Sequence, residues 1–360
     1  MNGNLHQAEQ ALASRMQCRY AVLTGNGTTA LWAALAALDL PGGSTVLYPA
    51  LTCETAVNAA IMTGLRPTFV DVQQTTAVPT AADLVLAATR LNARAVVPTH
   101  LFGHRAPTMP LTPACPAIMD AAQSSGRPEH LQGGRAAILS FGPGKQHDLG
   151  GGGAVLTDDT DVAATCRGLL AGLANNPDLA ASARRSLMVA LVDLGRRTDF
   201  GSADYARQRA ELIHQHRIGY LEPAGEELPN RVMDHWSHTD ITDSRRLVMT
   251  RLLEEALREI PGVHLLPRYP EDAPWRFTFR VLVRRDAVIT ALREIGLRPT
   301  RLFAPQHVLA GLPSSEFPGA MSLADSLVNL EFTQLGNDPA RTCRQIASTV
   351  ARALAQESVA

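Results

Sequence analysis

The sequence predicts an α/β fold with a mostly parallel seven-stranded sheet flanked by helices, followed by a smaller α+β domain. Short apolar runs alternate with helical segments over residues 21–157, which is the order expected of strand–helix–strand units. Most of these runs are continuously apolar, which is typical of strands buried on both faces. Because 360 residues exceed one typical domain, we place the larger domain at 1–235 and the smaller one at 236–360.

The elements of the larger domain follow in order. Apolar residues at helical spacing predict a first helix over 5–17, and Gly25 and Gly27 then turn the strand 21–23 into a second helix. The remaining strands are predicted at 45–48, 68–72, 95–97, 117–119, 136–141 and 154–157, with helices at 54–63 and 81–89 between them. Residues 158–235 are predicted to be helical at first and then irregular, because the stretches GRRTDFGSADYARQR (195–209) and YLEPAGEELPN (220–230) show little periodicity.

The smaller domain begins with a long helix. Leucines at helical spacing predict it from residue 242 up to Pro261 and Gly262. A strand at 276–282, a helix at 287–295 and a strand-like stretch with a closing helix after about 322 follow. This mixture predicts an α+β arrangement.

Composition and charge exclude several classes of function. Lys and Arg number 33 against 34 Asp and Glu, so the chain has no surplus charge to attract nucleic acid or a membrane surface. The five cysteines are scattered without a C-x-x-C pair, which predicts neither a disulfide framework nor a metal site. No signal pattern or long apolar run is present. We therefore expect a cytoplasmic protein that acts on small molecules.

Two of the loops that follow predicted strands could bind a phosphorylated aromatic cofactor. Gly27, Thr28 and Thr29 begin a helix, where free N–H groups and hydroxyls suit a phosphate; the alternative is that a threonine only caps the helix. Asp120 ends an apolar strand, where a carboxylate can pair with a buried pyridinium nitrogen; its alternative role is to cap the next turn. Ligands of parallel sheets bind at these strand ends.

Lys145 lies in the glycine-rich loop SFGPGKQHDLGGGG, between two predicted strands, and is the only lysine of the chain. A desolvated lysine can form a Schiff base with an aldehyde, which an arginine cannot do. A loop lysine can also be a simple surface charge, and a coding bias towards arginine would deplete lysine as well. The survival of one lysine in this loop favours the chemical role.

Five segments, taken in this order, resemble the DegT/DnrJ/StrS-type aminotransferases. These are NGTTAL (26–31), PALTCETAVNAAIMTGLRPTFVDV (49–72), VVPTHLFG (96–103), MDAAQSSG (119–126) and SFGPGKQHDLGGGGAVLTDD (140–159). APQH (304–307) and FPGAMSLADSLVNL (317–330) add a weaker match. The resemblance implies the fold type I architecture of pyridoxal 5′-phosphate (PLP) enzymes and the amination of keto sugars or cyclitols.

The resemblance also implies a role for each matching residue. Lys145 is expected to be the Schiff-base lysine and proton shuttle, and Asp120 the partner of the pyridine nitrogen. The other expected cofactor contacts are Gly27, Thr28, Thr29, Gln123, Ser140 and Asn230, with Cys53 at the position of the aromatic residue that usually stacks on the ring. Because the family's asparagine reaches the phosphate of the neighbouring subunit, a homodimer with shared sites is expected.

Four further residues are substrate candidates: His147, Arg231, Arg301 and His307. The arginines could bind the carboxylate of the amino donor, expected to be glutamate or glutamine. His147 could form an acid/base pair with Asp148, or the two could only hydrogen-bond the loop. Because Lys145 occupies the position that is histidine in related sugar dehydratases, amination of a carbonyl acceptor is favoured. A PLP-dependent dehydratase or eliminase on a cyclic carbonyl, and a PLP-binding protein without turnover, are the alternatives.

Overall fold

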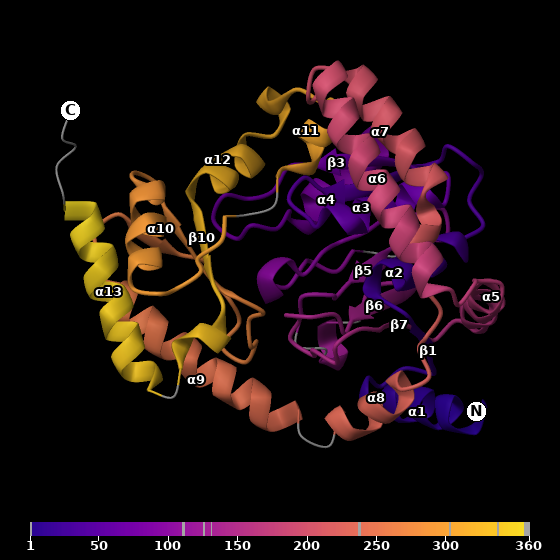
Figure 1. The fold of residues 1–360 in the computed structure, drawn as a ribbon, viewed down its shortest axis with the longest axis horizontal. Coiled ribbons are helices and arrows are strands. Elements are labelled where there is room, and N and C mark those ends of the chain that lie inside the picture. The colour runs from indigo at the N-terminus through magenta and orange to yellow at the C-terminus, as the bar shows by residue number, and fades with distance from the viewer. Residues whose placement is uncertain are drawn as a thin grey trace.

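The computed structural model describes residues 2–109, 112–124, 127–130, 132–236, 239–301, 304–336 and 338–355. Helix α1 (Asn2–Arg15) comes first and packs with α8 (Leu228–Trp236) below the sheet (Figure 1). The elements that follow α1 are β1 (Tyr20–Thr24), α2 (Gly27–Ala36), β2 (Thr45–Pro49), α3 (Glu54–Met62), β3 (Arg66–Val70), α4 (Ala81–Arg90), β4 (Ala95–Val96), β5 (Ile118–Asp120), β6 (Ala136–Ser140) and β7 (Gly153–Thr157). Strands and helices thus alternate as predicted.

In the part of the chain that the structure describes, these seven strands form one sheet in the order β3-β2-β4-β5-β6-β7-β1. Strand β2 pairs in parallel with β3 and β4, and β5 pairs in parallel with β6. A parallel bridge between Val96 and Ala117 joins β4 to β5. Strand β7 runs antiparallel to both neighbours, β6 and β1. The prediction of a mostly parallel seven-stranded sheet is confirmed.

The core of this half lies between the sheet and α2. All residues of β2 and β7 are buried, which explains their continuous apolar sequences. Helix α2 has Ala30, Leu31, Ala34 and Leu35 at helical spacing, each at most 1% exposed, against β6 and β7. This packing brings the N-terminus of α2 to the carboxyl end of β6.

Residues 158–235 form a largely helical segment, so the irregular structure predicted for the stretch 195–209 was wrong. Besides α5 (Thr160–Ala171) it contains α6 (Pro177–Arg197) and α7 (Ala203–Gln215), which lie side by side along the outside of α3 (Figure 1). Helix α6 begins with Asn176 as its cap and Pro177 in its first turn, a common start for a helix. One side of the helix meets the rest of the molecule through Ala180, Leu187 and Leu194, while further apolar residues of the helix are exposed.

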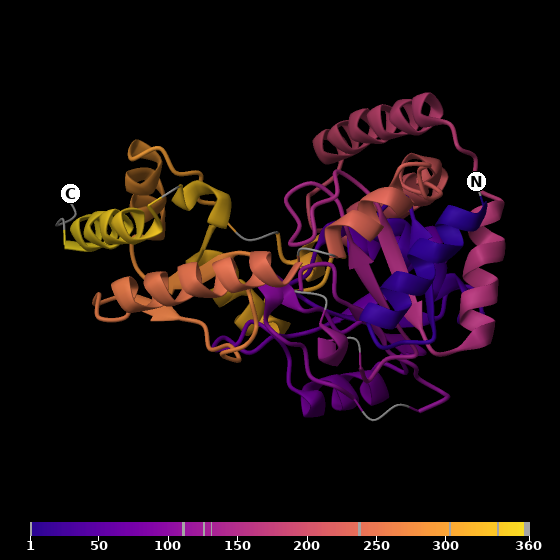
Figure 2. The same cartoon turned by 90° about the horizontal axis from the view of Figure 1, so that it is seen from below.

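The C-terminal part forms a second layered unit, seen apart from the sheet in Figures 1 and 2. It contains α9 (Thr239–Leu257), β8 (Val263–Leu265), β9 (Phe277–Val281), α10 (Arg285–Glu294), α11 (Gln306–Leu309), α12 (Pro318–Ser326), β10 (Leu327–Leu330) and α13 (Pro339–Ala355). Strand β9 lies between β8 and β10 and is antiparallel to both.

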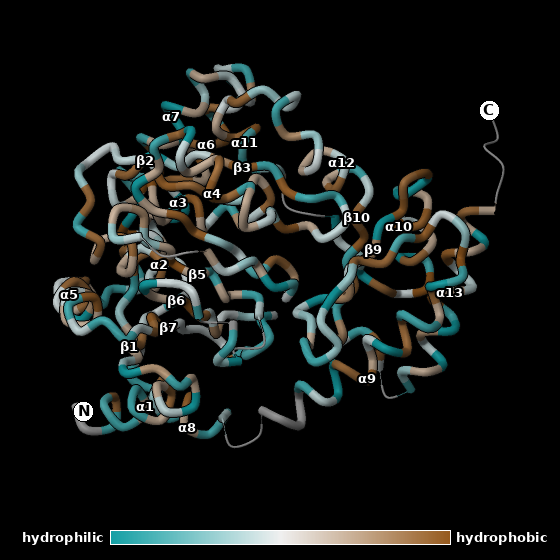
Figure 3. Tube along the Cα trace, turned by 180° about the vertical axis from the view of Figure 1, so that it is seen from behind, coloured by the Kyte–Doolittle hydropathy of each residue, from teal (hydrophilic) through white to brown (hydrophobic). Residues whose placement is uncertain are grey.

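The C-terminal unit has a hydrophobic core of its own. Phe279, Leu253 and Ile346 are fully buried together around β9, and the hydropathy colouring of Figure 3 shows this second group of apolar residues. The unit is α+β, as expected, while the exact domain boundary at 235/236 stays a prediction. Among the helices of the described residues, none is both long and apolar enough to cross a membrane.

Candidate active site

A cavity of about 120 Å³ lies where the carboxyl ends of β5 and β6 meet the N-termini of α2 and α3. Its lining combines segments that are far apart in the sequence. The predicted residues that line it are Gly27, Thr28, Cys53, Asp120, Gln123, Ser140 and Lys145; Asn26, Leu31, Thr55, Ala56, Ala122 and Ile138 complete it. The structure therefore brings most of the predicted cofactor contacts to one place.

The N-terminus of α2 forms one wall of the cavity. Asn26 caps the helix, because its side-chain oxygen accepts the N–H of Thr29 at 2.8 Å. The N–H groups of Gly27 and Thr28 belong to the first turn, where no acceptor exists within the helix. Together with the Thr28 hydroxyl and the positive end of the helix dipole, they suit a phosphate group.

Thr29 has a different role from the one predicted. It is fully buried behind the first turn, and its hydroxyl lies 3.1 Å from the side-chain oxygen of Asn26 and donates to the Tyr220 carbonyl at 3.0 Å. The same oxygen accepts the N–H of Glu222 at 3.1 Å. Its hydroxyl therefore secures the loop and does not line the cavity, which corrects the phosphate role expected for this residue.

Two glycines allow the strands to approach the helix closely. A Cβ on Gly27 would lie 2.7 Å from the Cβ of Ser140. A Cβ on Gly153 would lie 2.7 Å from the backbone carbon of Asn26 and 2.8 Å from the nitrogen of Gly27. Because neither position can accept a side chain without displacing its neighbour, the glycines determine that Ser140 sits beside the start of α2.

Asp120 ends β5 at the floor of the cavity and is 3% exposed. Its Oδ1 accepts the N–H of Ala122 at 3.1 Å, so it also supports the following turn. Burial raises the pKa of its carboxyl, while the Ala122 N–H, the charge of Lys145 and a hydrogen bond with Thr99 lower it in part. A carboxylate in this position would gain from a cationic group placed in the cavity.

Lys145 lies half-buried at the edge of the cavity, in the loop between β6 and β7. Asp148 holds this loop, because its carboxylate accepts the N–H groups of Gly144 at 2.7 Å and Gly150 at 2.8 Å. Arg231, on α8, donates to the Leu149 carbonyl. Asp148 and Arg231 thus fix the loop backbone, as expected for the loop hydrogen bond of Asp148, while the substrate role considered for Arg231 stays a prediction.

His147 lies beyond Lys145 and is buried against α8. Its Nδ1 is 3.0 Å from Nε2 of His235, and its ring packs on Trp236 with 4.5 Å between ring centroids. It does not line the cavity, so nothing in this geometry supports the substrate role considered for it, which stays a prediction. Asn230 is exposed on α8 and accepts a hydrogen bond from Asn4; its predicted contact with the phosphate of a second subunit stays a prediction.

The two C-terminal substrate candidates lie outside the cavity. Arg301 is exposed and forms an ion pair of 2.9 Å with Asp286. His307 is fully buried on α11 and stacks on Phe317 with 4.2 Å between centroids. Burial lowers the pKa of His307, against an opposing effect of Asp71. Neither residue lines the cavity, and their substrate roles stay predictions.

One residue beside Lys145 escaped the sequence analysis. The Nζ of Lys145 lies 4.9 Å from the ring centroid of Trp275, which precedes β9 in the C-terminal unit. The sequence holds three tryptophans, and only the packing of the two units distinguishes this one. Its rarity and its position just before a predicted strand were the only signals available.

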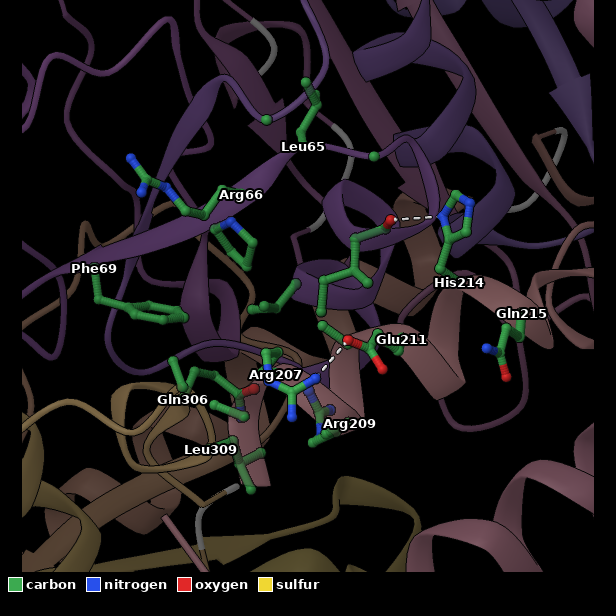
Figure 4. A pocket seen from close by; sticks show the side chains of 18 residues that line it. Leu65, Arg66, Phe69, Arg207, Arg209, Glu211, His214, Gln215, Gln306 and Leu309 are labelled. Carbon is green, nitrogen blue, oxygen red and sulfur yellow. Dashed lines mark hydrogen bonds and ion pairs between the residues drawn. The ribbon is translucent and has the colours of Figure 1, made fainter. Parts of the chain in front are cut away.

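A second and larger cavity, of about 620 Å³, lies between α3, β3, α7 and α11 (Figure 4). None of the predicted cofactor residues line it. Most of its charged groups are paired within the chain: Arg207 binds Glu211 at 2.9 Å, and Arg209 binds Glu54 and Asn58, while Arg66 donates to the Thr45 hydroxyl. The larger volume therefore does not mark the reactive centre, since it offers neither a lysine nor a free carboxylate.

The chemistry of the smaller cavity fits PLP. The start of α2, Thr28 and Ser140 suit its phosphate, Asp120 its ring nitrogen and Lys145 its aldehyde. Cys53, expected at the position where the family usually has an aromatic residue stacked on the ring, also lines the cavity. Its sulfur lies 3.2 Å from the hydroxyl of Thr55. The cavity lining contains no aromatic side chain within the described residues.

Known proteins place the chain in a family. The sequence model of the DegT/DnrJ/EryC1/StrS aminotransferase family matches residues 2–182. GDP-perosamine synthase of Caulobacter vibrioides is 27% identical over 320 residues, which cover 84% of this chain and 76% of that protein. The erythromycin biosynthesis sensory transduction protein EryC1 of Saccharopolyspora erythraea is 26% identical over 344 residues, 89% of this chain and 83% of that protein.

Solved structures support the fold. DesV of S. venezuelae matches with a TM-score of 0.71 and 22% identity, covering 98% of this chain and 90% of that chain. At this identity the likeness concerns the fold alone, and it agrees with the fold type I expectation. Together with the sequence match and the cavity, it leads to one conclusion: the chain belongs to the DegT/DnrJ/EryC1/StrS aminotransferase family and is a PLP-dependent aminotransferase.

Proposed function

We propose that this protein transfers an amino group from glutamate or glutamine to the carbonyl of a keto sugar, cyclitol or related compound in a biosynthetic pathway. The observation that carries the proposal is the convergence of Lys145, Asp120 and the N-terminus of α2 on one cavity. The relative named GDP-perosamine synthase supports a sugar-like acceptor. The donor follows from the family resemblance.

Each cavity residue has a task in this proposal. When bound, PLP supplies an aldehyde for amines and an electron-withdrawing ring that stabilises negative charge on a substrate carbon. Lys145 provides the only lysine amine of the chain and carries a proton at Nζ to and from the substrate carbon. Asp120 keeps a proton on the ring nitrogen, since its buried carboxylate favours a cationic neighbour.

The phosphate-binding groups orient the reaction. The N–H groups of Gly27 and Thr28, with the hydroxyls of Thr28 and Ser140, form an anion site at one end of the cavity. Asp120 and Lys145 would then meet the ring and the aldehyde, because the cavity joins all three regions. Holding the reacting groups in one geometry is a large part of such catalysis.

A half-reaction tests the proposal. PLP-loaded protein is mixed with glutamate, glutamine or a control amino acid without a carbonyl acceptor, and pyridoxamine phosphate is measured after denaturation. We expect its accumulation with glutamate or glutamine, and none with Lys145→Ala. Release of water or ammonia from a cyclic carbonyl compound, with no pyridoxamine phosphate formed, would favour elimination and contradict the proposal.

We further propose that the protein works as a homodimer. Helix α6 carries the exposed apolar side chains Met188 (59%), Val189 (71%) and Val192 (52%) close together in its C-terminal half, and such a group favours a protein contact. Light scattering after size-exclusion chromatography is expected to give twice the 38.6 kDa of the chain, and Met188→Glu with Val192→Glu is expected to shift it towards the monomer. A wild-type monomer at micromolar concentration would contradict the proposal.

The cytoplasm is the compartment that we propose. All five cysteines are free thiols, and Cys166 and Cys343 are buried. Free thiols of this kind suit a reducing compartment. Fractionation of cells that express the protein from its own gene should recover it with cytoplasmic enzymes, and its recovery outside the cell would contradict the proposal.

A further inference from the structure

Trp275 touches the lysine loop with both its polar and its aromatic part. Its indole Nε1 donates a hydrogen bond of 2.5 Å to the carbonyl of Gly144, the residue before Lys145. Its ring lies under the Nζ of Lys145, 4.9 Å from the centroid. The side chain is 7% exposed and comes from the C-terminal unit, just before β9. Two independent contacts therefore connect one residue to the reactive amine.

The backbone of Trp275 is itself anchored to the large half of the molecule. Its N–H donates to the Phe102 carbonyl at 3.0 Å, and the two rings stack with 8° between their planes and 6.3 Å between centroids. A Cβ on Gly103, whose φ is +92°, would lie 3.0 Å from Pro274 and from the nitrogen of Trp275. Only glycine permits this close approach of the two chain segments.

An ion pair fastens the same segment three residues earlier. Arg105 binds the buried carboxylate of Asp272 with two hydrogen bonds, each of 2.6 Å. Nearby, the Nδ1 of His104 lies 3.0 Å from the carbonyl of Pro267. Bidentate pairs of this kind fix geometry as well as adding energy. Residues 267–275 are thus held on the 102–105 loop, and Trp275 has little freedom to move away from Lys145.

We infer that Trp275 is a positioning residue for Lys145. The hydrogen bond to Gly144 fixes the backbone next to the lysine, and the electron-rich ring face attracts the ammonium group. The amine is thereby kept at the edge of the cavity. Trp275 does not line the cavity, so it acts through Lys145. The inference rests on the proposed function, since it explains how the proposed reactive amine is placed.

A purely structural role is the competing explanation, because Trp275 also belongs to the main hydrophobic core. The unique lysine separates the two explanations. In the cofactor-free protein, an amine-reactive ester can label only Lys145 and the α-amino group. Mass spectrometry of the two labelled peptides therefore gives the reaction rate of Lys145, with the α-amino group as an internal standard.

The first measurement compares Trp275→Leu, Trp275→Phe and the control Trp32→Phe with the wild type. Loss of a cation–ring contact that is partly shielded from water is expected to raise the labelling rate of Lys145 about two- to thirtyfold in Trp275→Leu. Trp275→Phe, which retains a ring but lacks the N–H donor, is expected to fall between this variant and the wild type. Trp32→Phe removes an indole from α2 and is expected to leave the rate unchanged.

The second measurement adds PLP and traps the product on Lys145 with borohydride. Trapping is expected to be slower in Trp275→Leu by a similar factor and partly restored in Trp275→Phe. Faster labelling with slower trapping is the signature of lost positioning. Equal labelling and trapping rates in the folded variants and the wild type would overturn the inference, and if Trp275→Leu does not fold, the Trp275→Phe result decides alone.

The two proposals fail in different ways. If wild-type Lys145 traps no PLP, the proposed function is refuted, while the labelling rates of the cofactor-free variants still decide the role of Trp275. If the wild type traps PLP but the Trp275 variants label and trap at its rates, the positioning role alone is refuted.

Discussion

Replacing Asp120 by asparagine should stabilise the cofactor-free protein while removing its activity. The side chain is 3% exposed, and the wild-type carboxylate has only part of its burial compensated by the Ala122 N–H, Thr99 and Lys145. Asparagine has the same shape and can still accept the hydrogen bond from Ala122. The substitution therefore removes a poorly compensated buried charge and little else.

The size of this effect follows from the burial of the charge, and its pH dependence from the raised pKa. An incompletely compensated buried charged group costs about 1–3 kcal/mol, which corresponds to a rise of about 1–4 °C in the midpoint of thermal unfolding for a chain of 360 residues. At pH values above the raised pKa of Asp120, the carboxylate is charged in the folded state and lowers the free energy of unfolding. As the pH falls from that value towards 3.8, the folded state takes up the proton first, and the difference between the two proteins disappears.

Calorimetry of the cofactor-free proteins between pH 8 and pH 4 tests this reasoning. Asp159→Asn is the matched control, because Arg135 and backbone donors lower the pKa of Asp159 and its replacement should not stabilise the protein. In the half-reaction, Asp120→Asn is expected to lose at least about a hundredfold in rate, since it cannot balance a positive ring nitrogen. A lower unfolding midpoint for Asp120→Asn at pH 8, with full activity, would refute the account of this residue.

Two further predictions concern the close packing at Gly153 and the buried histidine His104. Gly153→Ala places a Cβ against the backbone of Asn26 and should lower the free energy of unfolding in urea by about 1–3 kcal/mol. The control Gly168→Ala, in α5 with open space around it, should leave this free energy unchanged or raise it by up to about 1 kcal/mol. Equal effects of the two substitutions would count against the packing argument. Burial lowers the pKa of His104 to about 4, so the unfolded state gains a proton first as the pH falls from 6.5. The free energy of unfolding should therefore drop by about 3 kcal/mol over this range, and an unchanged pH slope in His104→Gln would show that His104 is not its source.

The order of elements in the first 157 residues could be predicted because each strand is an uninterrupted apolar run bounded by loop residues. Boundaries were less certain: β3 begins at Arg66, two residues before the predicted start, since pairing with β2 and not hydropathy determines where it begins. Helix α7 was missed because much of its surface faces solvent and few of its residues are apolar. Tertiary contact decides such segments.

In the candidate site too, some features could be predicted from the sequence and others depend on tertiary packing. Lys145, Asp120 and Thr28 could be found because a unique lysine and strand-end polar residues are visible in the sequence. The sequence could not show which polar residue of a loop faces the cavity: Thr29 differs from its neighbour Thr28 in facing the interior, and His147, two residues after Lys145, faces α8. Trp275 comes from a different unit, so only the packing of 267–275 on 102–105 reveals it.

Borohydride trapping of PLP on the wild-type protein tests the central claim most directly. The account predicts a single pyridoxyl adduct, located by peptide mass spectrometry on Lys145, the only lysine of the chain. Lys145→Ala should carry no adduct, and Lys145→Arg should not restore it, because arginine cannot form an imine. A wild-type protein that takes up no PLP, or that retains it unchanged when Lys145 is replaced, would contradict the account.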